Sequence, residues 1–448
     1  MACLILPVLL ALLLGCVNPP PAPPPVYLIV VDTLRVDALG CYGGKRPTPN
    51  FDRFAASSVV FENCLAPASW TVPSVASIWT GLYPFHHGTT KAATDNGGNV
   101  VSQESLSTGY TTLGEVFKQA GYRAYGISAN GHIAEAYGFA QGFDVFVGHS
   151  FKSKEQVAAS WAGLFPRLTA ERRFGQPTFV MFFFFDPHHP YIPQEPYITE
   201  YCPDWTERAK GLLDRDMVEL VNGGYFKKHP DQIEVARALY DSRVASLDAY
   251  FETLFRDLPD FDRAWVIVVA DHGESFGERG QMLHGNNLYQ PEAHVPLIIK
   301  LPRNQLAGKR IAAPVSLVDV LPTLAAIIQA PQPPKMDGVS LLPALADQPL
   351  PARPLFMQID VPWARQRAML LWPFKIVRTR HEPAEVYDLS HDPTESRDLR
   401  REKLAEMDHW ESELDLGTRI NIRFPPRVIN SDMTEEMRQK LRSLGYLH

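Results

Sequence analysis

Short apolar runs recur along the chain, and they predict buried β-strands. They are rich in β-branched and aromatic side chains and too short for typical helices. The runs lie at residues 26–31, 122–127, 177–185, 264–270 and 295–301. Three of them stop at an aspartate, namely Asp32, Asp186 and Asp271.

Apolar residues at helical spacing alternate with these runs. The longest such stretch covers residues 231–258, where Val235, Leu239 and Phe251 fall on one face. Further helices are predicted at residues 50–57, 113–120 and 315–328. Strands that alternate with helices are typical of the α/β class, so we expect a mostly parallel sheet sandwiched by helices.

The C-terminal part of the chain has a different pattern. A proline-rich crossing over residues 329–337 leads to short runs that predict a small antiparallel sheet, at residues 354–358, 368–371, 375–379 and 385–389. Amphipathic stretches at 400–416 and 433–444 predict helices. We therefore expect a main domain at residues 26–335 and a C-terminal subdomain at residues 336–448.

The N-terminus has the pattern of a targeting segment. The apolar run at residues 4–14 is too short to span a bilayer and suits the core of a signal peptide. Its end, Leu13-Leu14-Gly15-Cys16, resembles the lipobox of bacterial lipoproteins, and a proline-rich tether follows at residues 17–25. We expect residues 1–16 to be a lipoprotein signal peptide, with a lipid anchor at Cys16 that holds the protein at the cell envelope. The alternative is a plain secretory signal in which Cys16 has no role.

The net charge limits the expected partners, and the cysteines limit the expected disulfides. The formal net charge is −7, so the chain has no basic excess to neutralise nucleic-acid phosphates, and we expect no nucleic-acid partner. Cys3 and Cys16 belong to the targeting segment. Among Cys41, Cys64 and Cys202, a pair between Cys41 and Cys64 is possible in an oxidising compartment.

Residues 66–88 carry the first candidate for chemistry. Pro73 suits the first turn of a helix that ends at Gly81, which places Thr71 or Val72 at the N-cap. A hydroxyl there lies at the positive end of the helix dipole, which favours anions and lowers the cost of forming an alkoxide. A threonine that only caps the helix is the structural alternative.

Polar residues at the strand ends supply the second candidate. Asp32, His188 and the pair Asp271-His272 follow three of the predicted strands, and ligands of open α/β sheets bind beyond the carboxyl ends of the strands. Carboxylates with a neutral imidazole suit Mn²⁺, Zn²⁺ or Fe²⁺ better than Ca²⁺. We therefore expect a divalent metal site at this edge of the sheet.

These stretches resemble the sulfatase family within the alkaline phosphatase superfamily. The ordered matches are Val30-Val-Asp32-Thr-Leu-Arg35, Thr71-Val-Pro73-Ser74, Thr80-Gly81-Leu-Tyr-Pro84, His188-His-Pro190-Tyr191, Asp271-His272-Gly273 and Val295-Pro-Leu-Ile-Ile299. The resemblance covers about residues 26–400. It implies the alkaline-phosphatase-like α/β fold and a metal-dependent enzyme that cleaves anionic esters.

Several departures from the family pattern are similar to the threonine-nucleophile branches, such as lipoteichoic acid synthases and nucleotide phosphodiesterases. Sulfatases carry Cys-x-Pro-Ser-Arg, whose cysteine becomes formylglycine, whereas this chain has threonine at position 71 and valine at position 75. No formylglycine can form without that cysteine. The family's Asp-Asp is here Asp32-Thr33, its Asp-Asn is Asp271-His272, and no lysine occurs between residues 124 and 133.

The chemistry of the nucleophile favours phosphate over sulfate. A formylglycine hydrate releases sulfate by collapsing to the aldehyde. A sulfated Thr71 cannot form an aldehyde, so it has no equivalent route for releasing sulfate. A phosphorylated Thr71 can be attacked at phosphorus by water or by an acceptor alcohol. We predict a hydrolase or transferase that acts on phosphate mono- or diesters of a small molecule, glycan or lipid headgroup. The alternatives are a sulfuric ester hydrolase of the arylsulfatase type and an inactive binding lipoprotein.

The resemblance also assigns roles to individual residues. The metal ligands would be Asp32, Thr71, Asp271 and His272. His188 and His284 would stabilise the transferred group or protonate the leaving group. Arg35 would pair with an aspartate near the metal or contact substrate, and Asn130 would contact substrate oxygens.

Five other polar residues are weaker candidates. His86, His87 and His294 are spare ligands for a second metal, although a lone histidine is more often satisfied structurally. Glu274 and Glu278 are expected to be solvated loop residues.

Overall fold

The apolar runs of the sequence form the central strands of one sheet. The computed structural model describes residues 23–94, 100–149, 153–173 and 175–430. β1 (Val26–Val31) lies between two parallel strands, β7 (Thr178–Phe184) and β8 (Trp265–Ala270). Every side chain of β1 and β7 is buried, as expected for strands that helices cover on both faces.

The sheet is mostly parallel and mixed at one side. Its other strands are β2 (Val59–Leu65), β5 (Arg123–Ser128), β6 (Val145–Gly148), β11 (His294–Lys300), β12 (Arg310–Ile311) and β13 (Val315–Ser316). The order across the sheet is β12-β2-β11-β8-β1-β7-β5-β6, and β13 pairs with β2. β11 runs antiparallel to both β8 and β2.

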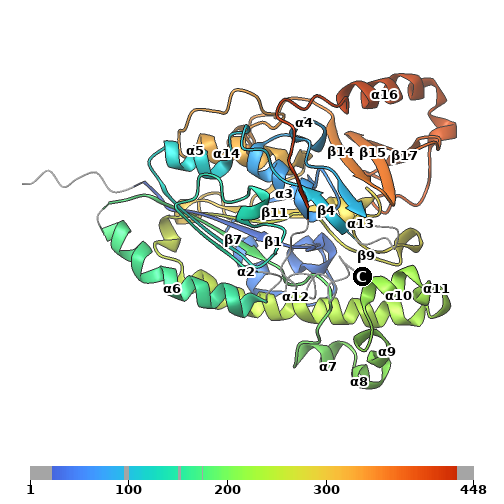
Figure 1. The fold of residues 1–448 in the computed structure, drawn as a ribbon, viewed down its shortest axis with the longest axis horizontal. Helices are drawn as coiled ribbons and strands as arrows, with labels where there is room; N and C mark the ends of the chain where they lie inside the picture. Colours follow the sequence, from blue (N-terminus) through green and yellow to red (C-terminus); the bar gives the residue numbers. More distant parts are fainter. Residues whose placement is uncertain (1–22, 95–99, 150–152, 174, 431–448) are drawn as a thin grey trace, which may run out of the picture.

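Helices cover both faces of this sheet (Figure 1). One face carries α3 (Thr71–Thr80), α5 (Leu113–Gln119) and α14 (Val320–Ile327). The other carries α2 (Pro49–Ala56), α6 (Lys154–Arg173) and α12 (Asp231–Asp257). This arrangement puts the carboxyl ends of the parallel strands at one edge, where the loops that follow them meet.

Short helices fill the connections between these elements. They are α4 (Pro84–His87), α7 (Tyr197–Tyr201), α8 (Trp205–Arg208), α9 (Lys210–Leu213), α10 (Met217–Asn222), α11 (Tyr225–Lys228), α13 (Gln290–Ala293) and α15 (Leu342–Leu345). The helices α7 to α11 follow one another in the segment that connects β7 to α12. No helix of the described segments is both long and apolar enough to cross a membrane.

The C-terminal part forms a separate antiparallel sheet. Its strands follow in sequence order, as β14 (Leu355–Val361), β15 (Ala364–Leu371), β16 (Phe374–Thr379) and β17 (Glu385–Asp388). One face packs Met357 and Leu370 against Leu288 of the main domain. The other face packs against Trp410 and Leu414 of α16 (Leu404–Gly417). Both faces are therefore covered over the middle of this sheet.

Two smaller sheets complete the described elements. β3 (Ala92–Thr94), β4 (Val100–Glu104) and β18 (Val428–Asn430) form one of them. β9 (Ser275–Phe276) and β10 (Met282–Leu283) form the other, directly after the Asp271-His272 pair. The second of these sheets borders the candidate site.

The predicted fold class is confirmed, and the differences concern single elements. The helix expected over residues 315–328 begins only at Val320, because Val315 and Ser316 pair with Cys64 and Leu65 of β2. Ser316 and Asp319 then form a capping box that starts the helical turns. The strands β2 and β6 and the helix α6 were not predicted.

Some predictions concern residues outside the described ranges, and others remain untested. The signal peptide, the Cys16 anchor and the last helix at 433–444 lie outside those ranges, and the domain boundaries remain predictions. Cys41, Cys64 and Cys202 are free thiols in the structure, so the possible Cys41–Cys64 pair is not formed.

Candidate metal centre and active site

The strand ends bring the predicted ligands together. Asp32 follows β1 and Asp271 follows β8, and these neighbouring parallel strands are in register, with Val31 opposite Ala270. The backbone N–H of Asp32 donates to the carbonyl oxygen of Phe184 (2.9 Å), which extends the pairing with β7 by one residue. The two carboxylates therefore leave the sheet side by side.

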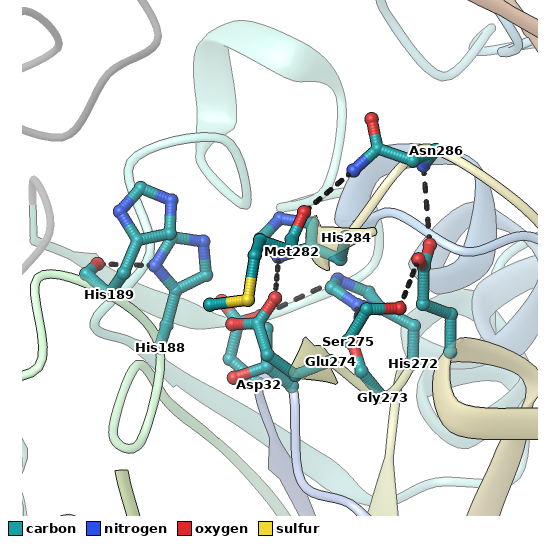
Figure 2. Close-up of polar contacts among 12 residues, drawn as sticks. Asp32, His188, His189, His272, Gly273, Glu274, Ser275, Met282, His284 and Asn286 are labelled. Atoms are coloured by element: carbon teal, nitrogen blue, oxygen red, sulfur yellow. Dashed lines mark hydrogen bonds and ion pairs between the residues drawn. The ribbon is translucent and has the colours of Figure 1, made fainter. Parts of the chain in front are cut away.

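Asp32, Asp271 and His272 form a cluster that can hold a metal ion. One ligand atom from each residue lies within 4.8 Å of the other two, and all three residues are fully buried. His272 Nε2 lies 3.6 Å from Asp32 Oδ1 and 3.5 Å from Asp271 Oδ2. Figure 2 shows Asp32 and His272 in this cluster, beside His284.

The hydrogen bonds of these three side chains leave one potential ligand atom of each facing the other two. Asp32 Oδ1 and Asp271 Oδ2 are buried and have no hydrogen-bond partner among the described residues. His272 Nδ1 lies 2.9 Å from the carbonyl oxygen of Gly273, a contact that places the proton on Nδ1 and leaves the lone pair on Nε2. Two buried carboxylate oxygens and one imidazole lone pair fit Mn²⁺, Zn²⁺ or Fe²⁺.

Without a bound cation, it is unfavourable to keep two charged carboxylates this close together in a buried site. Burial and the nearby charge of Asp271 raise the pKa of Asp32 well above its usual value, and burial also raises the pKa of Asp271. Burial lowers the pKa of His272 to about 4, so its ring is neutral near pH 7. A divalent cation would balance the two carboxylates and accept the neutral ring as a ligand.

Thr71 lies at the start of α3, next to this cluster. Its Oγ1 is 3.3 Å from His272 Nε2, and Ser74 Oγ donates to the carbonyl oxygen of Asp271 (2.5 Å), which ties the first turn of α3 to the end of β8. The N-cap is Trp70 and not Thr71 or Val72, so the predicted cap position was wrong by one or two residues. Thr71 is therefore the first helical residue, at the positive end of the helix dipole.

Asn130 contacts a predicted metal ligand. It follows β5, and its Nδ2 donates to Asp32 Oδ2 (2.7 Å) while its Oδ1 accepts from the backbone N–H of His132 (2.8 Å). The amide thereby fixes one oxygen of Asp32 and leaves Oδ1 facing His272. Its predicted contact with substrate oxygens is untested, and the contact that the structure gives is with Asp32.

The match to a family model covers most of this architecture. The sequence model named Sulfatase matches residues 24–330, which is more than half of the chain. The chain belongs to the sulfatase family.

Similar proteins include both sulfatases and a phosphonate hydrolase. "Uncharacterized sulfatase YidJ" of Escherichia coli is 23% identical over 436 residues, which cover 84% of this chain and 83% of the relative. The solved complex of BT4656 with its substrate D-glucosamine-2-N,6-O-disulfate has a TM-score of 0.69 at 19% identity, covering 89% of this chain and 99% of the other. The phosphonate monoester hydrolase of Agrobacterium radiobacter has a TM-score of 0.68 at 20% identity, covering 88% and 95%. At these identities, the solved structures establish the fold alone.

Three histidines of this sulfatase-family protein surround the cluster. The ring centroid of His284 is 4.5 Å from that of His272 and 4.8 Å from that of His188 (Figure 2). His188 and His189 stack at 4.3 Å, and burial lowers the pKa of both. The predicted site residues His188 and His284 therefore lie beside His272, although their roles stay predictions. His189 was missed, despite its place in the same His-His-Pro-Tyr segment.

The prediction that Glu274 is a solvated loop residue was wrong. It is fully buried rather than solvated, and it accepts hydrogen bonds from Tyr191 Oη (2.9 Å) and pairs with His284 Nδ1 (2.9 Å). Burial raises the pKa of this carboxyl to about 8. The backbone is held there by bonds from Gly273 N to Glu292 O and from Glu274 N to Pro291 O. A Cβ at Gly273 would lie only 2.0 Å from Pro291 O, so this close approach requires glycine.

Arg35 is oriented by residues other than the metal ligands. Its guanidinium pairs with Asp37 (2.7 Å) and Glu278 (2.8 Å) and donates to the carbonyl oxygen of Glu274. Arg35 therefore pairs with an aspartate, but Asp37 is half exposed and is not a member of the metal-ligand cluster, so the predicted role near the metal stays untested. Glu278 was expected to be solvated, and the structure places it in this ion pair.

The spare histidines have other partners. His86 pairs with Asp337 (2.8 Å), His87 Nε2 lies 3.1 Å from Ser77 Oγ, and His294 Nε2 lies 2.8 Å from the carbonyl oxygen of Glu62. None of the three belongs to the metal-ligand cluster of the described residues.

Replacement of Asn130 by alanine is expected to weaken metal binding by about 10–100-fold, because residues that orient a ligand commonly contribute this much. The measurement is the affinity for Mn²⁺, obtained by competition with a metallochromic chelator. Asn63→Ala is the matched control, since the Asn63 amide donates to the carbonyl oxygen of Ala312 at the surface and lies outside the ligand cluster. Equal Mn²⁺ affinity of the Asn130 and Asn63 variants would refute this role.

Proposed function

We propose that the protein is a metal-dependent phosphoesterase that uses Thr71 as its nucleophile. The observation that carries this proposal is the position of the Thr71 hydroxyl, at the first residue of α3 and 3.3 Å from His272 Nε2. The sequence has no cysteine at this position, so a formylglycine nucleophile is not available. The substrate would be a phosphate mono- or diester of a small molecule, glycan or lipid headgroup.

The residues that would hold the metal are Asp32, Asp271, His272 and the Thr71 hydroxyl. When bound there, a divalent cation supplies positive charge that lowers the pKa of the hydroxyl and neutralises the phosphate oxygens. The N-terminus of α3 adds to the same effect, because the first backbone N–H groups of a helix have no acceptor within it.

The covalent steps follow from the position of Thr71. Thr71 Oγ loses its proton to water and attacks phosphorus, and the bond from phosphorus to the leaving oxygen breaks on the opposite side. His284 is oriented by Glu274. Burial lowers the pKa of His284 to about 3, so its ring is neutral near pH 7 and would donate an N–H hydrogen bond to the transferred oxygens, while the leaving oxygen takes its proton from water. Water, or an acceptor alcohol in a transferase, then attacks phosphorus and releases Thr71 with its proton restored.

The test compares three chromogenic esters with one metal-loaded protein. We expect hydrolysis of bis-p-nitrophenyl phosphate or p-nitrophenyl phosphate to exceed that of p-nitrophenyl sulfate, because a sulfated Thr71 has no aldehyde-forming exit. Faster turnover of the sulfate would favour a sulfuric ester hydrolase, the activity named for several relatives. Turnover of none of the three, together with no retained metal, would favour a binding protein without catalysis.

We also propose that a lipid anchor at Cys16 holds the enzyme at the bacterial cell envelope. The support is the apolar run that ends in Leu13-Leu14-Gly15-Cys16 and the proline-rich tether that follows. Metabolic labelling with an alkyne fatty acid should mark the wild-type protein and not Cys16→Ser. Equal labelling of both would exclude this anchor.

A further inference from the structure

A pocket of about 360 Å³ opens on the C-terminal sheet, outside the metal centre. Its walls carry four arginines from β15, β16 and the turn that follows, namely Arg365, Arg367, Arg378 and Arg380. Asp360 of β14 is the only carboxylate among the described residues that line it. The pocket is thus strongly basic, although the whole chain has a net charge of −7.

The register of the strands brings these like charges together. Arg367 lies directly opposite Arg378 in the pairing of β15 with β16, and the backbone N–H of Arg380 donates to the carbonyl oxygen of Arg365. Like charges directly opposite each other destabilise a sheet. An anion between the guanidinium groups would remove this repulsion and form charge-assisted hydrogen bonds.

Two of the four arginines form close ion pairs with carboxylates. Arg365 pairs with Asp360 (3.3 Å), and Arg378 pairs with Asp415 of α16. Over the described ranges, no carboxylate forms an ion pair with Arg367 or Arg380. Arg367 donates instead to the hydroxyl of Thr418 (3.4 Å), and Arg380 is exposed. These two guanidinium groups have no carboxylate in close contact and remain for a ligand, although the charge of Arg367 also helps to lower the pKa of Asp415.

The buried side-chain amide of Gln358, which lies beside Arg367 in the sheet, indicates a ligand with hydroxyl groups. Gln358 lies opposite Arg367 in the pairing of β14 with β15 and lines the pocket. It is only 4% exposed, and its Oε1 has no hydrogen-bond partner among the described residues. A buried carbonyl oxygen without a donor is costly, and a ligand hydroxyl would satisfy it.

The hairpin that carries the pocket also contacts the active-site segment. Trp363 lies in the turn between β14 and β15, two residues before Arg365, and its Nε1 donates to the carbonyl oxygen of Gly285 (3.1 Å). Gly285 directly follows His284. Trp363 is 53% exposed, so an apolar ring face is available at the end of the hairpin that carries Arg365.

We propose that this pocket binds an anionic group of an acidic saccharide, at a site separate from the metal centre. The arginines bind the anionic group, Gln358 accepts a sugar hydroxyl, and Trp363 packs against a sugar ring. Sulfate, phosphate and carboxylate groups share this chemistry. The binding of the saccharide at this pocket does not depend on the proposed ester-cleaving function.

The test measures binding separately from turnover. Fluorescence anisotropy with a fluorescein-labelled heparin-derived hexasaccharide, a polyanionic probe, gives the Kd for the full-length protein at fixed salt. The double variant Arg367→Gln/Arg380→Gln should raise the Kd by about tenfold or more, because it removes two charge-assisted contacts. Arg367→Lys/Arg380→Lys should retain more affinity than the glutamine variant. Arg401→Gln, an exposed arginine of the same subdomain outside the pocket, is the matched control and should leave the Kd unchanged.

Displacement of the probe and a Trp363 variant distinguish a saccharide site from a site for free oxyanions. Unlabelled maltohexaose, which is neutral, should not displace the probe, and Trp363→Ala should weaken binding. Displacement by inorganic sulfate or phosphate as effective as that by the unlabelled hexasaccharide, with no effect of Trp363→Ala, would overturn the saccharide proposal. Equal Kd values for wild type, the double glutamine variant and Arg401→Gln, or no binding at all, would overturn the site itself.

Activity measurements distinguish failure of this proposal from failure of the proposed function. The double glutamine variant should hydrolyse bis-p-nitrophenyl phosphate like the wild type, because this small ester does not need the pocket. Thr71→Ala should bind the hexasaccharide with the wild-type Kd. Loss of binding in Thr71→Ala, or loss of small-ester turnover in the double variant, would contradict a separate pocket.

Discussion

Thr71→Ala is expected to lower kcat/KM for bis-p-nitrophenyl phosphate by at least about 10³-fold, because the substitution removes the nucleophilic oxygen. Thr71→Ser keeps a hydroxyl at the start of α3 and should retain a measurable part of the activity. Both variants should still bind Mn²⁺ through the cluster of Asp32, Asp271 and His272. The measurement is steady-state kinetics on metal-loaded protein of known metal content.

The matched control for this variant is Thr169→Ala on α6. The Thr169 hydroxyl donates to the carbonyl oxygen of Phe165 within its own helix and lies outside the ligand cluster, so its loss should leave kcat/KM unchanged. A Thr71→Ala protein that is folded, carries metal and keeps wild-type activity would exclude Thr71 as the nucleophile. Phosphothreonine at position 71 in acid-quenched wild-type enzyme would give direct support.

Lys375→Met is expected to destabilise the protein by about 3–5 kcal/mol, because it leaves a buried carboxylate without its cation. Lys375 of β16 and Glu395 both have fully buried side chains, with Nζ 2.7 Å from Oε1. The second carboxylate oxygen of Glu395 accepts from the backbone N–H of Gln290 at the start of α13. This ion pair therefore links the C-terminal sheet to the segment that follows the active site. Urea unfolding followed by circular dichroism gives the free energy of unfolding.

Two further variants separate the buried charge from the packing of the side chain. Lys375→Met/Glu395→Gln removes both charges and should recover a large part of the lost stability. Lys403→Met removes a lysine whose pairing with Glu406 is partly exposed (3.7 Å), and it should cost less than about 1 kcal/mol. A loss in Lys375→Met no larger than that in Lys403→Met would show that the buried pair contributes little.

The cluster of Asp32, Asp271 and His272 was predictable from the sequence because of how parallel strands are arranged. Asp32 and Asp271 each follow a short apolar run, and the carboxyl ends of parallel strands meet at one edge of a sheet. Their neighbouring positions across β1 and β8 required no knowledge of the loops. Thr71 was predictable for a similar local reason, since Pro73 and Gly81 mark the two ends of its helix.

Residues whose roles depend on packing between distant segments were not predictable. The sequence around Glu274 predicts a solvated loop carboxylate. In the structure it is buried, because it contacts His284 and Tyr191, which lies 83 residues away in the chain. Arg35 has the family's position in the motif, yet its partners Asp37 and Glu278 were not identified from spacing. The strand β2 was missed, because it combines apolar residues with Glu62 and Asn63 and pairs with distant β11.

The sequence by itself determined the α/β class, the family and the residues that end the central strands, because short-range patterns and strand-end positions carry that information. The tertiary structure alone decided which atoms of those residues face one another, that Asn130 bonds to Asp32, and that Glu274 orients His284. It also brought Arg365, Arg367, Arg378 and Arg380 into one pocket, since the register of β15 with β16 sets which side chains are neighbours. Burial and strand register arise from contacts between segments far apart in the chain, and no local pattern specifies them.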